Sequence, residues 1–176
     1  MQRLIFLLMA ALATAPAIAQ APLGIYHRWG AFTQADAKRC YALSKAVSSA
    51  GRRVHQPYAS VSFSPERGGA PQFYVRLSNR KRAGSAVILR IDDRAFQLIG
   101  QEIHAWAPDA AADTAIIGAM RTGVALSVET RSEGGTRVRD RYVLRGAASA
   151  IDSAAFACAS PRRWKKAAAR ATWRQP

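Results

Sequence analysis

Short runs in which the residue type alternates with a period of two constrain the fold of this chain more than any other feature. YASVSFS at 58–64 and QFYVRLS at 72–78 both follow a period of two. GIYHRWGAFT at 24–33 alternates more loosely, and CYALSKAV at 40–47 is a further candidate. Because successive side chains of a strand point to opposite faces of its sheet, each of these runs predicts one β-strand.

Two longer segments are predicted to form hairpins. AVILRIDDRAFQLIG at 86–100 has two apolar runs on either side of an Asp-Asp-Arg turn sequence. VALSVETRSEGGTRVRDRYVLRG at 124–146 has Gly134-Gly135 at its tip. In its return strand, Val138, Tyr142 and Leu144 share a face with Asp140, which predicts a carboxylate in an apolar setting.

Two segments change to a helical period. In 106–123, Asp109 follows Pro108, Ile116 and Met120 are four positions apart, and Gly123 closes the run, so start and stop signals are both present. In 147–160 the apolar residues fall at the spacing of one helical stripe, which ends at Cys158 and is followed by Pro161. The predicted fold is therefore mainly β: a single antiparallel domain of six to eight strands with two short α-helices. It is either β-sandwich-like or a sheet with helices packed on it.

The first 19 residues are predicted to be a signal peptide. One cation, Arg3, precedes an apolar run and a closing small-residue pattern that ends at Ala19. The apolar run is shorter than the roughly 20 residues that span a bilayer, so we expect cleavage after Ala19 and no transmembrane segment in the mature chain. The predicted destination is the periplasm or the exterior, with the β-rich domain at 20–160 and a basic tail at 161–176.

The chain has two cysteines, Cys40 and Cys158, near the ends of the predicted domain. In an exported protein an isolated pair usually forms a disulfide, although two separate buried thiols remain the alternative. Such a bond would close a loop of more than a hundred residues and stabilise the fold by about 2–5 kcal/mol.

The charge of the chain indicates an anionic partner. Lys and Arg number 26 against 11 Asp and Glu, which gives a net charge of +15. The tail has six cations, two tryptophans and no acid, and its candidate contacts with an anionic partner are Arg162, Arg163, Trp164, Lys165, Lys166, Arg170, Trp173 and Arg174. Outside the cytoplasm such a partner is a lipid phosphate, an acidic glycan or an acidic envelope protein rather than nucleic acid. The alternative is a solvated tail without a partner.

The order of several stretches resembles the invasion-associated locus B family of exported bacterial proteins. These stretches are Trp29 ahead of KRCYALS at 38–44, DDRAFQLIGQEIHAWAPDAAADTAIIGAMRTG at 92–123, TRSEGGTRVRDRYVLRG at 130–146 and AIDSAAFAC at 150–158. The resemblance covers roughly residues 26–158 and implies a β-rich periplasmic or surface domain linked to the envelope and, in pathogens, to host-cell entry. It implies no molecular activity, and the tail lies outside the shared pattern.

The sequence offers little for catalysis, so we expect no enzyme, no catalytic residue, no cofactor and no metal. Glu102 and His104 are two positions apart, but two ligands do not complete a metal site. Asp140 is the most interesting candidate acid or base, although buried carboxylates are more often paired. Trp29 and Trp106 are expected in the core, and if exposed they would stack on a sugar ring.

Three hypotheses follow from the sequence. The first is a non-enzymatic envelope protein that binds an anionic component. The second is an adaptor that pairs with a protein partner through the cationic loop SNRKRAGS at 78–85 or a sheet edge. The third is a hydrolase or metal enzyme built around Glu102, His104 or Asp140.

Overall fold

The computed structural model describes residues 20–34, 38–50 and 53–159 of the chain. The predicted signal peptide and the basic tail, with all eight of its candidate contacts, lie outside these residues. Nothing in the structure therefore tests the division of the chain into leader, domain and tail.

The described residues form eleven strands, two α-helices and one short 3₁₀ helix. In chain order the elements are β1 (Gln20–Tyr26), β2 (Trp29–Gln34), β3 (Arg39–Lys45), β4 (Ser48–Ala50), β5 (Tyr58–Phe63), η1 (Pro65–Arg67), β6 (Gln72–Arg76), β7 (Val87–Ile91), β8 (Arg94–Gln101), β9 (His104–Trp106), α1 (Ala110–Thr122), β10 (Ala125–Arg131), β11 (Arg137–Val143) and α2 (Ala147–Ala159).

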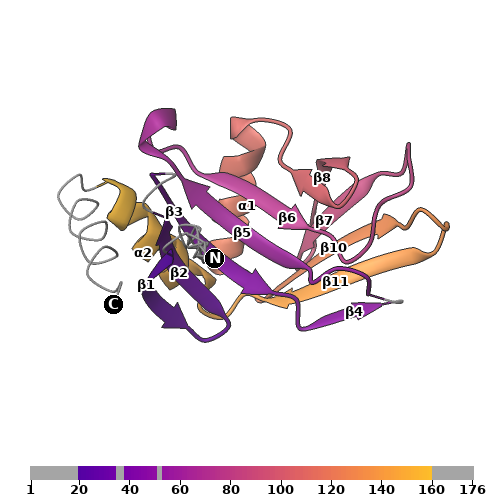
Figure 1. Ribbon diagram of the computed structural model, residues 1–176, viewed down its shortest axis with the longest axis horizontal. Helices are drawn as coiled ribbons and strands as arrows, with labels where there is room; N and C mark the ends of the chain where they lie inside the picture. The colour runs from indigo at the N-terminus through magenta and orange to yellow at the C-terminus, as the bar shows by residue number, and fades with distance from the viewer. Residues whose placement is uncertain (1–19, 35–37, 51–52, 160–176) are drawn as a thin grey trace, which may run out of the picture.

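All eleven strands belong to one antiparallel sheet in the order β1-β2-β3-β5-β6-β9-β8-β7-β10-β11-β4 (Figure 1). The sheet curls into a half-barrel because two segments cross between its halves. β8 pairs with β7 along 94–98 and with β9 along 99–101. On the other side, β3 leads within two residues to β4, which pairs with β11. We call β1, β2, β3, β5, β6 and β9 the β3 half, and β4, β7, β10 and β11 the β11 half.

Both α-helices lie on the concave side of the curled sheet. α2 contacts β1, β2, β3 and β5, whereas α1 contacts β6, β7 and β8. In Figure 1, β3, β5 and β6 pass in front of the helices, and the near face of these strands carries no helix. The core lies between sheet and helices and contains the fully buried Trp29, Phe73, Ile116, Met120 and Ile151.

The helix boundaries follow the predicted signals. The side chain of Asp109 accepts a hydrogen bond from the N–H of Ala112 (2.7 Å), as an N-cap residue does. At the other end, the N–H of Gly123 bonds the carbonyl of Ala119 (2.8 Å). α2 begins after Gly146 and buries Ile151 and Ala154, so the predicted stripe is confirmed.

The mainly β, antiparallel and disulfide-closed fold is confirmed, but three details differ from the prediction. A sandwich is not confirmed, because one hydrogen-bonded sheet contains every described strand. The run 24–33 is a hairpin rather than one strand: His27 has a φ of 56°, and the chain turns there between β1 and β2. The three-residue strands β4 and β9 were not predicted, because they are too short to show a period.

Candidate functional site

The uncovered face of the β3 half has an unusual composition for a sheet surface. The exposed face of an antiparallel sheet is ordinarily polar, but this one carries rings from five different strands. They are the side chains of Phe32, Tyr41, Tyr58, Tyr74 and Trp106, all partly exposed. Strand alternation places them here, because the residues between them, such as Cys40, Ala59, Phe73 and Ala105, point into the core.

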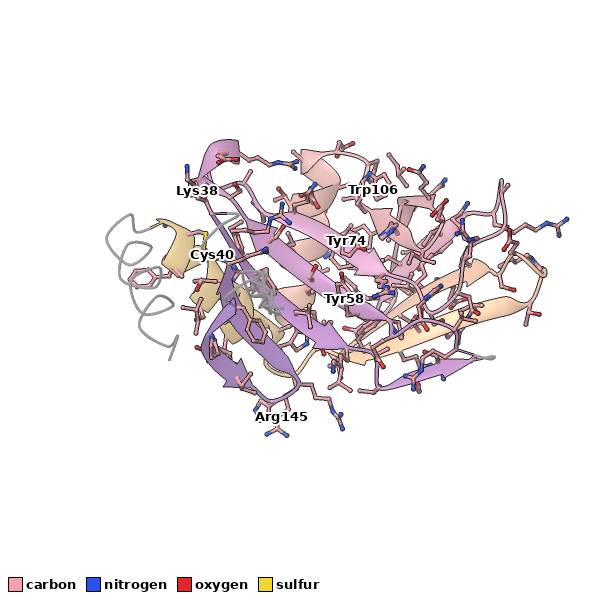
Figure 2. The ribbon with its side chains drawn as sticks, viewed as in Figure 1. Lys38, Cys40, Tyr58, Tyr74, Trp106 and Arg145 are labelled. Atoms are coloured by element: carbon pink, nitrogen blue, oxygen red, sulfur yellow. A yellow bond between two sulfur atoms is a disulfide. The ribbon has the colours of Figure 1, made fainter. Side chains whose placement is uncertain are left out.

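Four of these rings line a groove of about 470 Å³, which we call the aromatic groove. Polar side chains alternate with the rings, and Arg39 is the only charged side chain among its described lining residues. The volume lies within the range of small-molecule sites, about 300–1,000 Å³. Figure 2 shows Tyr58, Tyr74 and Trp106 in a row across β5, β6 and β9. The groove is lined by Gln34, Arg39, Tyr41, Leu43, Tyr58, Ser60, Ser62, Gln72, Tyr74 and Trp106.

Contacts between the rings hold this face in a defined shape. Phe32 stacks on Tyr41 with ring centroids 5.5 Å apart, and Tyr58 lies 5.8 Å from Tyr74. The Tyr74 hydroxyl and Nδ1 of His104 share a 2.5 Å hydrogen bond. Burial, followed by the neighbouring Tyr58, raises the pKa of Tyr74 well above its ordinary value, so its hydroxyl remains protonated at neutral pH.

A second feature lies on the outer face of the β11 half. Arg90, Arg137, Arg139 and Arg141 point to the same side of the sheet, because Ser127 pairs with both Arg90 and Arg141, and alternate residues of β11 share a face. We call these four residues the arginine face. They line two shallow hollows of about 310 and 250 Å³, the larger of which contains Arg90, Arg139 and Arg141.

The carboxylate of Glu129 lies within the arginine face. It forms ion pairs with Arg137 and Arg139, both at 2.5 Å. Burial opposes its ionisation, but the hydrogen bond from Arg137 and the charge of Arg139 outweigh that effect and hold the pKa of Glu129 below its ordinary value. Asp92 also lines the larger hollow. Four guanidinium groups thus share this face with two carboxylates, and the face keeps an excess of positive charge.

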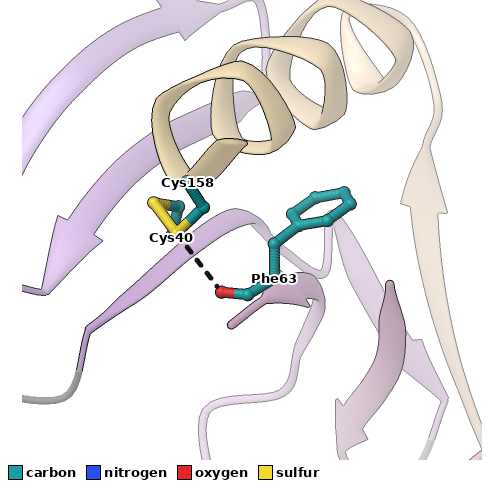
Figure 3. The surroundings of a disulfide bond; sticks show 3 residues. All are labelled: Cys40, Phe63 and Cys158. Carbon is teal, nitrogen blue, oxygen red and sulfur yellow. Dashed lines mark hydrogen bonds between the residues drawn. A yellow bond between two sulfur atoms is a disulfide. The ribbon is translucent and has the colours of Figure 1, made fainter. Parts of the chain in front are cut away.

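The predicted disulfide is confirmed. Cys40 of β3 and Cys158 of α2 are bonded, with their Cα atoms 5.7 Å apart and 118 positions between them in the sequence. Figure 3 shows the bond beside Phe63, whose carbonyl oxygen lies 3.5 Å from Sγ of Cys158. A disulfide sulfur has no proton to donate, so this is a packing contact. The bond links α2 covalently to β3, in the middle of the β3 half.

The residues considered for catalysis have separate structural partners. Glu102 occupies the β8–β9 turn and pairs with Arg80 (2.8 Å), whereas His104 bonds Tyr74 on the neighbouring strand. Within residues 20–34, 38–50 and 53–159, no three His, Cys, Asp or Glu side chains are grouped so that they could hold a metal ion.

Asp140 is fully buried and accepts a 2.9 Å hydrogen bond from the N–H of Ser78. Its neighbour on the same face, Tyr142, is also buried, and burial followed by the charge of Asp140 raises the pKa of the Tyr142 phenol. The prediction that Asp140 shares an apolar face with Val138 and Tyr142 is confirmed. Its partner is a backbone amide, so the carboxylate joins two segments of the fold.

The two tryptophans differ. Trp29 is fully buried and donates a 2.9 Å hydrogen bond to the carbonyl of Val143, as expected of a core residue. Trp106 was predicted to be a core residue, and this was wrong: its side chain is partly exposed and lines the aromatic groove. It points outward because its neighbour Ala105 occupies the core position of β9.

Sequence reasoning missed both the aromatic groove and the arginine face. The signal for the second was present in RVRDRYV at 137–143, where every second residue from 137 to 141 is arginine. The groove has no such signal, because its residues come from five strands that are adjacent only after folding.

None of the α-helices in the described part of the chain is long and apolar enough to cross a bilayer.

Comparison with known proteins identifies a shared fold. The structure matches that of invasion associated protein b from Bartonella henselae with a TM-score of 0.55 and 17% sequence identity, over 73% of this chain and 92% of that protein. No protein-family model matches the sequence, and no curated protein sequence matches it either. The half-barrel of this chain is therefore related in fold to invasion associated protein b.

Proposed function

We propose that this chain is an exported, non-enzymatic protein of the bacterial cell envelope that binds an anionic component of the envelope or of a host surface. The ligand groups would be phosphate, carboxylate or sulfate, as on lipid headgroups and acidic glycans. The arginine face is the observation that carries this proposal.

The arginine face suits a multivalent anion better than a single ion. Arg90 lies on β7, Arg139 and Arg141 lie on β11, and β10 runs between these two strands. The three side chains line one shallow hollow. Neighbouring strands of a sheet are roughly 4.8 Å apart, so β7 and β11 are roughly 10 Å apart, and their arginines can contact several anionic groups of a surface or a polymer together. Guanidinium groups bind phosphate and carboxylate with two parallel hydrogen bonds, which adds geometric selectivity to the attraction of charge.

Two further observations support the proposal. The first 19 residues have the charge and apolar pattern of a signal peptide, which predicts export. The fold is similar to that of invasion associated protein b. The sequence also resembles the invasion-associated locus B family in the order of several stretches between residues 26 and 158. The basic tail at 161–176 would add a second set of cations to the same interaction.

Co-sedimentation with vesicles tests this function. The mature chain and a form truncated after Ser160 are each mixed with phosphatidylglycerol vesicles and with phosphatidylcholine vesicles across a salt series. We expect both forms to bind only the anionic vesicles, with affinity that falls as salt rises, because exposed charges are screened. Weaker binding by the truncated form would assign part of the affinity to the tail.

If neither form binds anionic vesicles, and neither is retained by immobilised heparin as a sulfated glycan, the proposal is wrong. The adaptor hypothesis would then take its place, with the loop at 78–85 or a sheet edge as the contact for a protein partner.

A further inference from the structure

The aromatic groove points to a second binding site, separate from the arginine face. It lies on the β3 half, and the two sites share no residue. We infer that the aromatic groove binds a short oligosaccharide, with sugar rings stacked on Tyr41 and Trp106 and hydroxyl groups bonded by the polar side chains between them.

The sheet register places the rings of this groove in two rows. One row of paired residues runs Phe32–Tyr41–Ser62–Gln72, and the next runs Leu43–Ser60–Tyr74–Trp106. In each row, then, an aromatic ring lies beside a hydroxyl group. This alternation of apolar faces and polar groups continues across β2, β3, β5, β6 and β9.

A surface of alternating rings and polar groups is chemically complementary to a sugar. A pyranose ring has faces of C–H groups with partial positive charge and a rim of hydroxyl groups. Aromatic faces carry the negative part of the ring quadrupole, so they attract those C–H groups. Serine and glutamine side chains both donate and accept hydrogen bonds, as sugar hydroxyls require. Ser60, Ser62, Gln34 and Gln72 provide these groups along the groove.

The rings of the aromatic groove are preorganised. The hydrogen bond between Tyr74 and His104 fixes one ring, and the stacked pair Phe32–Tyr41 fixes another. Fixed rings lose little conformational entropy when a ligand binds, which favours binding to a weakly apolar ligand such as a sugar. The charge of the groove also fits: with Arg39 as its only charged described side chain, it has no cluster of cations for the phosphates of a nucleotide.

Saturation-transfer NMR with the mature chain tests the inference first, using cellotetraose and chitotetraose at up to about millimolar concentration. Transfer to the ring C–H protons of at least one tetrasaccharide is the expected result. No transfer to either compound would contradict the inference, and binding of a proline-rich peptide instead would identify the groove as a peptide site.

Variants then locate the site. Tyr41→Ala and Trp106→Ala should each weaken binding of the tetrasaccharide by about tenfold or more, the effect of removing one stacking ring. Ser62→Tyr, which keeps all the rings and fills the groove, should abolish binding even if an alanine variant folds poorly. Phe96→Ala is the control, since Phe96 is a half-buried ring on β8 outside the groove. Unchanged affinity in Ser62→Tyr would overturn the assignment.

Separate variants distinguish sugar binding by the aromatic groove from anion binding by the arginine face. Substitution of Arg90 and Arg141 should leave tetrasaccharide binding unchanged while it weakens vesicle binding, and the groove variants should have the opposite pattern. Loss of both activities in the same variants would contradict two separate sites.

Discussion

The N–H of Ser78 donates a 2.9 Å hydrogen bond to the carboxylate of Asp140, which lies 62 positions later in the chain. Ser78 follows β6 on the β3 half, whereas Asp140 belongs to β11, and both are fully buried. The carbonyl of Ser78 in turn accepts hydrogen bonds from the N–H groups of Val54 and His55. Ser78 thus connects three segments inside the half-barrel, and the Asp140 carboxylate accepts its amide hydrogen bond, which gives a structural reason for an acid in an apolar strand.

Asp140→Ala should lower the free energy of unfolding by about 1–3 kcal/mol, because it leaves the Ser78 amide buried without its acceptor. Asp140→Asn keeps an acceptor oxygen and should cost less. Urea denaturation measures both, with Asp93→Ala as a control at an exposed turn position, where the expected change is within about 0.5 kcal/mol. Equal stability of Asp140→Ala and the wild-type protein would rule out this role.

The pair Glu129 and Arg137 should make stability depend on pH. The pKa of Glu129 is lowered in the folded state, so its contribution is fully present above the pKa of the unfolded chain and is lost as pH falls through the folded pKa. The contribution of Glu129 to the stability of the wild-type protein should therefore decrease as pH falls below its ordinary pKa of 4.5. Glu129→Gln should have a flatter profile in thermal denaturation over that range; an unchanged slope would contradict the assignment.

Loss of the disulfide should destabilise the fold without changing its architecture. The bond closes a loop of 118 positions, and the double variant Cys40→Ser with Cys158→Ser should lose about 2–5 kcal/mol of stability. Denaturation of the wild-type protein with and without reductant provides a matched comparison. Reductant should lower the unfolding midpoint of the wild-type protein and leave that of the double variant unchanged.

Two glycine substitutions should change the free energy of unfolding in opposite directions. Gly146 has a φ of 91°, and a Cβ atom there would lie 2.0 Å from the carbonyl oxygen of Tyr26, so Gly146→Ala should cost more than about 2 kcal/mol. Gly118 lies on the exposed side of α1 with no atom within 4 Å of its Cβ position, so Gly118→Ala should add about 0.5–1 kcal/mol. Thermal unfolding of both variants and the wild-type protein measures the two effects. A Gly146→Ala variant that is more stable than the wild-type protein would contradict the close contact with Tyr26.

Local patterns predicted the elements better than their assembly. The cap residues Asp109 and Gly123 define α1, and Gly134-Gly135 marks the turn of the β10–β11 hairpin, because these signals act within a few residues. The sheet order was not predictable, since the crossing of β8 and the link from β3 to β4 depend on contacts between distant segments. A one-sheet half-barrel and a sandwich have nearly the same strand patterns.

The candidate sites were likewise predictable only where the signal was local in the sequence. The cysteine pair was predictable because two cysteines allow only one pairing, and the predicted export favours its oxidation. The tail residues were chosen on charge alone, and they lie outside the described residues. Arg90, Arg139 and Arg141 form a face only through the register of β7, β10 and β11, and Trp106 faces the aromatic groove because Ala105 fills the core position.

We propose that the arginine face, rather than net charge alone, binds anionic surfaces. The most direct test measures the dissociation constant for phosphatidylglycerol vesicles with Arg90→Ser and Arg141→Ser combined. The matched control, Arg28→Ser with Arg145→Ser, removes two exposed cations elsewhere. Each cation near an anionic surface contributes on the order of 1 kcal/mol, so the first pair should weaken binding by about tenfold or more, with a shallower salt dependence. The control should change little; equal losses in both pairs would contradict the account.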